Sequence, residues 1–127
     1  MKMLRNPLAV ARNHGSAKSG VEHWWAQRFS AIVLIPLTLW LVWAMAVLAG
    51  ADHAAARDWL AAPWNAGMAI LAIAAIFYHA RLGLQVVIED YVAHRPLEMG
   101  LQIIVGIGAL AGAVVSIVSV LIVALSG

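Results

Sequence analysis

Three long apolar runs, separated by short polar stretches, dominate the pattern of this chain. They cover approximately residues 29–49, 65–88 and 100–125, and the first run contains no charged residue. A helix needs about 20 apolar residues to cross a hydrocarbon core of about 30 Å, and each run meets that length. The pattern predicts an all-α membrane protein whose three transmembrane helices lie within residues 23–127. Residues 1–22 are polar and rich in turn-forming residues, which predicts a flexible N-terminal tail.

The stretches between the runs predict short connections. Residues 50–64 form a polar loop in this prediction, and residues 89–99 form a second loop interrupted by Pro96. Pro36 lies inside the first run, where it removes one backbone donor and predicts a bend. The first run is near twenty residues, longer than the roughly 7–15 apolar residues of a signal peptide. We therefore expect it to remain a membrane helix.

Composition narrows the classes of function. The 127 residues are 64% hydrophobic and 11% charged, with a mean hydropathy of +0.89, whereas soluble domains are about half apolar and a quarter charged. Cysteine is absent, which excludes disulfides, iron–sulfur ligation and thiol catalysis by this chain. Any redox centre must use histidine or be bound non-covalently.

The distribution of basic residues predicts the orientation in the membrane. The first loop carries only Arg57 and the second loop carries Arg95, whereas the N-terminal segment carries five basic residues: Lys2, Arg5, Arg12, Lys18 and Arg28. Basic residues favour the cytoplasmic side, so the N-terminus is predicted to be cytoplasmic and the C-terminus periplasmic. The net charge of +2 is small, and the cluster of basic residues near the N-terminus is interpreted as a topology signal. No nucleic-acid partner is expected.

His79 lies deep inside the second apolar run, where ionisable residues face a protein interior or a ligand more often than lipid. It precedes Asp90 by eleven residues, about three turns and roughly 16 Å, so both side chains share one helix face. One interpretation is an axial haem ligand, with Gly83 one turn away leaving room for the macrocycle. The other is a histidine hydrogen-bonded to a neighbouring helix. Since His23 and His53 are poorly placed, a second haem ligand would come from another chain.

Asp90 and Tyr91 end the second run at the predicted membrane surface. Tyr91 could donate a hydrogen bond to a quinone carbonyl, with Asp90 ordering water or a basic partner for proton delivery. The adjacent Glu89 leaves open which of the two carboxylates delivers the proton. The alternative is an interfacial aromatic residue beside an exposed acid. Arg28 is predicted at a similar depth, where it pairs with Asp90, a haem propionate or a quinone oxygen, or simply extends to the surface. Arg81 lies deeper and needs an anionic partner or a route to the surface.

The third run has a row of small residues, and no motif in the chain completes an active site. Small side chains at four-residue spacing let helices approach closely. The row predicts contact with another helix, of this chain or of a second one, by Gly108, Gly112 and Ser116, with Ala109 and Ala113 beside them. There is no nucleotide-binding loop, zinc pattern or serine–histidine–aspartate set. Catalytic turnover by this chain alone is not expected.

These motifs resemble a known family. The run His79-x-x-x-Gly83 followed by Asp90-Tyr91, in the middle of three spans, resembles the small hydrophobic membrane anchor of succinate dehydrogenase (succinate:quinone oxidoreductase, complex II). The residues that open the first span, Gln27-Arg28-Phe29-Ser30-Ala31, are similar to the arginine-containing motif of that subunit. The resemblance extends from about residue 20 to the C-terminus.

The resemblance implies a respiratory function. Such an anchor pairs with a cytochrome b subunit in a bacterial inner membrane, or in the mitochondrial inner membrane of a eukaryote, and docks iron–sulfur and flavoprotein subunits. Electrons pass from succinate to ubiquinone, linking the tricarboxylic acid cycle to the respiratory chain. By motif, His79 would be an axial ligand to haem b, Tyr91 with Asp90 would contact ubiquinone, and Arg28 would lie near the quinone or the haem propionates. Two alternatives stay open: a fumarate reductase anchor, and a non-redox structural membrane protein that forms a colourless complex.

Overall fold

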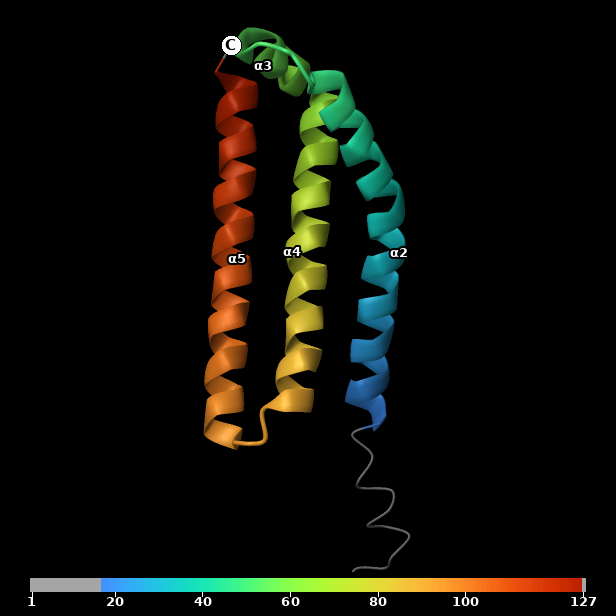
Figure 1. The fold of residues 1–127 in the computed structure, drawn as a ribbon, viewed down its shortest axis with the longest axis vertical. Coiled ribbons are helices and arrows are strands. Elements are labelled where there is room, and N and C mark those ends of the chain that lie inside the picture. Colours follow the sequence, from blue (N-terminus) through green and yellow to red (C-terminus); the bar gives the residue numbers. More distant parts are fainter. Residues whose placement is uncertain (1–16, 127) are drawn as a thin grey trace, which may run out of the picture.

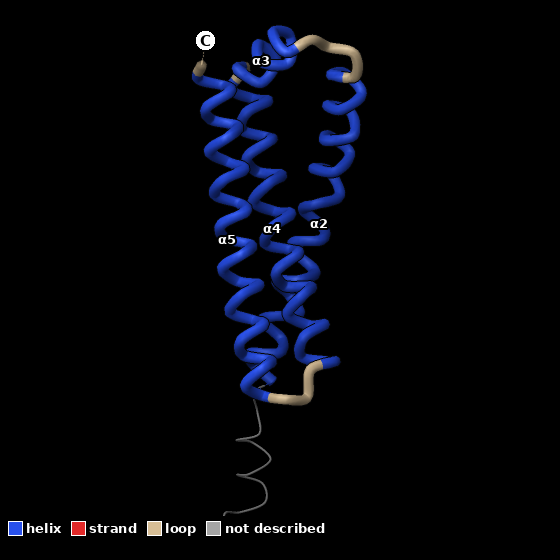
Figure 2. Tube along the Cα trace, turned by 60° about the vertical axis from the view of Figure 1, so that its left-hand side comes forward, coloured by secondary structure: helices blue, strands red, loops and turns tan. Residues whose placement is uncertain are grey.

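The computed structural model describes residues 17–126, which form three long helices and one short helix. The long helices lie side by side, with the second of them between the other two, and the short helix lies across one end (Figure 1). In chain order they are α2 (Ala17–Leu48), α3 (His53–Ala61), α4 (Pro63–Tyr91) and α5 (Arg95–Leu125). The predicted all-α architecture is confirmed. We call the end at the α4–α5 connection the turn end, and the opposite end the α3 end (Figure 2).

The three long helices are long and apolar enough to cross a membrane. The apolar helical segments are Gly20–Leu48, Pro63–Tyr91 and Arg95–Leu125, of 29, 29 and 31 residues. At 1.5 Å per residue they extend about 44–47 Å, more than the roughly 30 Å of hydrocarbon, so their ends reach the headgroup regions. The spans predicted at 29–49, 65–88 and 100–125 coincide with these helices, which extend further at most of their ends.

Helix α2 begins at Ala17, well before the predicted start of the first span. Of the predicted tail, residues 1–16 lie outside the described residues, and residues 17–22 are helical. No proline interrupts this stretch, and Gly20 costs only about 1 kcal/mol in a helix interior, which the continuing helix tolerates. Pro36 lies within α2, and the helix continues through it as a bowed rod (Figure 1).

The prediction of an irregular loop over residues 50–64 is wrong, because most of it is α3. Asp52 caps this helix: its Oδ1 accepts a hydrogen bond from the backbone N–H of Ala55 at 2.8 Å. A run of alanines, residues 54–56, favours the helix that follows. Gly50, with φ of 86°, provides the left-handed turn that ends α2.

The second connection is also shorter than predicted, and comprises only residues 92–94. Pro96 was expected to interrupt a loop, but it lies in the first turn of α5. A proline is favourable there, because the N–H groups of a first helical turn have no partner within the helix. Glu98 in the same turn stabilises it through the helix dipole.

Helix α4 packs against α2 on one side and α5 on the other. Its buried apolar residues are Ala72, Leu82 and Ile88, whereas α5 has none. A Cβ atom added to Gly112 of α5 would lie 2.5 Å from Cε1 of Phe77 in α4, so this glycine permits the close approach. Gly108 is exposed, with nothing within 4 Å. The small-residue row therefore packs within the chain through Gly112.

An aromatic cluster fixes α3 onto the long helices. Trp59 stacks on Trp40, with ring centroids 6.0 Å apart, and tilts against Trp43 at 6.3 Å. The amide of Asn65 donates a hydrogen bond to the backbone carbonyl of Trp59 at 2.8 Å. Elsewhere the helices expose large apolar side chains such as Leu39 and Ile104. An apolar exterior of this extent suits contact with lipid or partner helices.

Candidate functional site

The contact that defines the site joins His79 of α4 to Ser30 of α2. Nδ1 of His79 lies 2.8 Å from Oγ of Ser30, which in turn donates to the backbone carbonyl of Gln27 at 3.0 Å. Ser30 is buried, with 6% of its surface exposed. A hydroxyl carries one hydrogen, so the arrangement that makes both bonds has Nδ1–H donating to Ser30. Nε2 then carries no hydrogen and keeps its lone pair. A neutral imidazole in this form can ligate a metal through Nε2.

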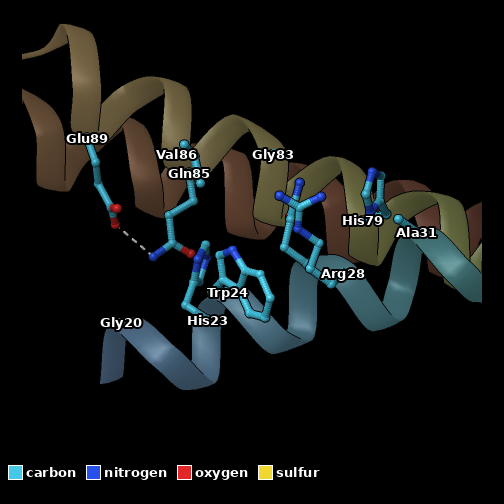
Figure 3. Close-up of a pocket in the computed structure, with 11 residues that line it drawn as sticks. Gly20, His23, Trp24, Arg28, Ala31, His79, Gly83, Gln85, Val86 and Glu89 are labelled. Carbon is cyan, nitrogen blue, oxygen red and sulfur yellow. Dashed lines mark hydrogen bonds between the residues drawn. The ribbon is translucent and has the colours of Figure 1, made fainter. Parts of the chain in front are cut away.

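His79 faces a groove of about 850 Å³ between α2 and α4 (Figure 3). The groove lies in the half of the bundle toward the turn end, and both helices contribute to its walls. Its lining residues combine small, polar and charged side chains: Gly20, His23, Trp24, Gln27, Arg28, Ala31, His79, Gly83, Gln85, Val86 and Glu89. A hollow of this size falls within the range of cofactor and ligand sites.

Gly83 lies one turn from His79 and leaves space in the groove. A Cβ atom added there would meet only Nε2 of Gln27, at 3.7 Å, which is an ordinary van der Waals contact. The glycine is therefore not needed for α2 and α4 to pack. It leaves room beside the imidazole, as expected from the sequence.

Arg28 lines the same groove as His79. Its guanidinium carbon lies 5.3 Å from the ring centroid of Trp24, within the range of a cation–π interaction. Among the described residues no salt bridge joins Arg28 to Asp90. The cation is thus held on an aromatic ring at the groove, with its hydrogen-bond donors available to an acidic occupant.

The groove also contains two buried polar atoms that have no hydrogen-bond partner among the described residues: Nε2 of His23 and Oε1 of Gln27. Buried polar atoms are normally paired, so these two fit an occupant that supplies the missing hydrogen bonds. Nε2 of His23 as a donor, Nε2 of His79 and the Arg28 cation fit an iron porphyrin whose edge carries carboxylates, whereas Oε1 of Gln27 requires a hydrogen-bond donor. No group of three or more His, Asp or Glu side chains in residues 17–126 forms a self-contained metal site.

Asp90 and Tyr91 do not line the groove. They end α4, and both are exposed, Tyr91 by 84% of its surface. The carboxylate that does line the groove is Glu89, whose Oε1 accepts from Nε2 of Gln85 at 2.9 Å. The structure thus brings His79 and Arg28 together, and places Asp90 and Tyr91 at the turn end outside the groove.

Sequence reasoning missed the contributions of Ser30 and Gln85, and it left open which of the adjacent carboxylates, Glu89 or Asp90, belongs to the site. Gln27 and Ser30 are three residues apart at the start of the first apolar run, so they share one face. That spacing could have identified the side of α2 that turns toward a polar residue of another span. The pairing of Ser30 with His79, residues 49 apart in sequence, could not be identified from spacing.

Comparison with known proteins identifies the family. The succinate dehydrogenase/fumarate reductase transmembrane subunit family matches residues 2–125. The chain belongs to this family. It is 38% identical over 116 residues to the succinate dehydrogenase hydrophobic membrane anchor subunit of Rickettsia bellii, covering 91% of this chain and 93% of the relative.

Two further relatives agree with this assignment. The corresponding subunit of Rickettsia conorii is 37% identical over 99 residues, with 77% of this chain and 79% of the relative covered. The succinate dehydrogenase membrane anchor subunit of Reclinomonas americana is 37% identical over 78 residues, with 59% and 65% covered. No solved structure matches the chain. The family predicted from the motifs is confirmed, and the roles of His79, Arg28, Asp90 and Tyr91 stay predictions.

Proposed function

We propose that this chain is the hydrophobic membrane anchor subunit of succinate dehydrogenase, and that His79 is an axial ligand of a haem b shared with a cytochrome b subunit. The observation that carries the haem assignment is the hydrogen bond between Nδ1 of His79 and Ser30, at 2.8 Å. It holds the imidazole in the tautomer that leaves Nε2 for the iron. A histidine ligand is commonly held by a hydrogen bond on its second ring nitrogen.

The residues of the groove have separate tasks in this proposal. Ser30 orients the imidazole, and Gln27 fixes Ser30 through its backbone carbonyl. Gly83 leaves room for the macrocycle, and Arg28 binds a propionate or a quinone oxygen through its planar fork. The iron porphyrin, when bound, supplies a one-electron carrier within the membrane.

The quinone assignment concerns the turn end of α4. Tyr91 would donate a hydrogen bond to a ubiquinone carbonyl, and Asp90 would order water for proton delivery. Both side chains are exposed in this chain, so the pocket would be completed by a partner subunit. We assign this end to the cytoplasmic side, where iron–sulfur and flavoprotein subunits would dock, from the excess of basic residues in the N-terminal segment.

The proposed complex lies in the inner membrane of a bacterium and carries electrons from succinate to ubiquinone. A fumarate reductase anchor is the second candidate, since the matching family includes both enzymes. The relatives from Rickettsia bellii and Rickettsia conorii are both succinate dehydrogenase subunits, which supports the first. The quinone that co-purifies with the complex distinguishes them: ubiquinone favours the first candidate and menaquinone the second.

Substitution of His79 tests the haem assignment. The complex is purified in mild detergent through this chain, and its reduced-minus-oxidised visible spectrum is recorded for wild type, His79→Ala and His79→Gln. We expect both variants to lose or strongly perturb the b-type signal while the subunits still co-purify. The control is His53→Ala, because His53 is exposed at the start of α3 and its loss should leave the spectrum unchanged. A wild-type spectrum in both His79 variants would refute ligation.

A further inference from the structure

Arg81 lies on a different face of α4 from His79. Two residues along a helix correspond to about 200° of rotation, so the two side chains point to opposite sides. Arg81 points to α5, where its Nε lies 3.8 Å from the position of a Cβ added to Gly106. It is absent from the lining of the groove between α2 and α4. The cation therefore has no part in the site described above.

The depth of Arg81 requires either a counter-charge or extension of its side chain to the headgroup region. The rise from Arg81 to the end of α4 at Tyr91 is about 15 Å, which places the cation well inside the span. No salt bridge or side-chain hydrogen bond within residues 17–126 involves it. Glu89 and Glu98, which lie toward the turn end, accept hydrogen bonds from Gln102 instead. An arginine at this depth is costly without an anionic partner.

The surface around Arg81 is a groove that is apolar except for this cation, the amide of Gln102 and the phenol of Tyr78. It comprises two hollows between α4 and α5, of about 550 and 190 Å³, and Arg81 lines both. The larger hollow extends along α5 toward the turn end, past Ile103 to Met99 and Gln102. Its outer part is formed by Ile103, Ile107 and Leu110, and Gly106 lies between them. We call this the α4–α5 groove.

We propose that the α4–α5 groove binds one anionic phospholipid, whose phosphate accepts hydrogen bonds from Arg81. The planar guanidinium matches phosphate oxygens in a bidentate geometry. The long side chain of Arg81 can extend toward the headgroup region. The lipid phosphate then needs to enter the hydrocarbon region only a short way to reach the guanidinium. An acyl chain then lies along Ile103, Ile107 and Leu110.

The shape of the groove favours a lipid over a partner helix. A helix with its side chains is about 10–12 Å across, and close helix packing uses small residues at the contact. The apolar side chains around the larger hollow are large and exposed: Ile103 by 59%, Ile107 by 64% and Leu110 by 68%. A narrow hydrocarbon chain can lie between such side chains over Gly106, whereas a helix would be held away from Arg81.

Lipid retention by the purified complex tests this proposal. The complex, purified through this chain, is delipidated in detergent, exposed to phosphatidylglycerol or phosphatidylcholine vesicles, and repurified. Bound phospholipid per chain is then counted by mass spectrometry. We expect wild type to retain phosphatidylglycerol over phosphatidylcholine, and Arg81→Gln to bind phosphatidylglycerol about tenfold more weakly, as for a lost charge-assisted hydrogen bond. Arg81→Lys keeps the charge and should bind at an intermediate level. Equal phosphatidylglycerol retention by wild type and Arg81→Gln would overturn the proposal.

A second variant separates the groove from the charge. Gly106→Leu fills the space beside Arg81 while keeping the cation, and should lower retention of either lipid. Arg57→Gln removes a cation at the α3 end and should retain lipid like wild type. If Arg81→Gln lost a partner subunit while the remaining complex kept its phosphatidylglycerol, Arg81 would pair with a protein carboxylate and the lipid proposal would be wrong. The b-type spectrum should be unchanged in all these variants, so this test is independent of the haem assignment.

Discussion

Helix α4 contacts its two neighbours through surfaces of different kinds. Toward α2 the contact is a hydrogen bond between His79 and Ser30, beside a polar groove. Toward α5 it is the packing of Phe77 onto Gly112. The surface toward α2 leaves an open groove and orients the imidazole of His79. The surface toward α5 brings the backbones of the two helices together. One face of α4 can therefore border an open groove because its other face is fixed by close packing on α5.

The largest effect on stability is expected from overfilling the contact between Phe77 of α4 and Gly112 of α5. Gly112→Leu introduces a side chain whose Cβ alone would lie 2.5 Å from Phe77, so α4 and α5 must separate. We expect a loss of about 1–3 kcal/mol in the free energy of unfolding, measured as a lower thermal midpoint of the complex in detergent. Gly108→Leu is the matched control, because nothing lies within 4 Å of that glycine. Equal midpoints for the two variants would show that this contact does not fix the pair.

A smaller and more specific effect is expected at the surface of α4 toward α2. Ser30→Ala removes the partner of Nδ1 of His79, and loss of such a partner typically weakens metal binding by about 10–100-fold. We expect the lower part of that range, seen as reduced haem per complex and an altered low-spin electron paramagnetic resonance signal. Ser30→Thr keeps the hydroxyl and should restore both. If Ser30→Ala bound haem like wild type, the hydrogen bond would be structural.

Substitution of Tyr91 tests whether the exposed end of α4, outside the groove, contacts the quinone. Tyr91→Phe removes one hydrogen-bond donor, a loss of about 0.5–1.5 kcal/mol. We expect a several-fold lower rate of ubiquinone reduction, with succinate oxidation by an artificial dye unchanged. Equal losses in the two assays would count against a quinone contact.

The smallest effect concerns the position of Arg28. Trp24→Leu removes the ring under its guanidinium and with it about 0.5–1 kcal/mol of cation–π interaction. We expect a small shift of the haem potential or a small rise in the KM for ubiquinone, and no change in thermal midpoint. Trp64→Leu is the control, because Trp64 is exposed by 72% of its surface at the start of α4, whereas Trp25 packs edge-to-face on Trp24 itself. A matching shift in both variants would show that Trp24 acts only as an interfacial aromatic residue.

The sequence predicted the fold well, because three apolar runs with few alternatives determine three helices in a membrane. His79 was recognised as a candidate site residue because an ionisable side chain is costly deep inside an apolar run. That argument did not require knowledge of its neighbours. The error over residues 50–64 came from interpreting a short polar stretch as a loop, although Asp52 and the alanines after it favour α3. The error at Pro96 came from treating proline as an interruption when it also starts helices.

The composition of the site was harder to predict, because it depends on how α2 is rotated against α4. The helical period alone places Asp90 within about 20° of His79, yet Glu89 lines the groove. The face of α4 that forms the groove shifts toward Gln85 and Glu89 at the turn end, and this shift depends on the crossing of two helices. No local spacing in the sequence encodes that crossing. The pairing of Ser30 with His79 depends on it as well.

The bond between Ser30 and His79 has a consequence for assembly. Fixing a side chain on binding costs about 0.5–1.5 kcal/mol in lost rotameric freedom. Because the imidazole is already held at Nδ1, that loss occurs when α2 and α4 pair. In the proposed haem site the imidazole is thus oriented before the metal arrives, so the pairing of α2 with α4 in the bilayer would precede and favour haem insertion.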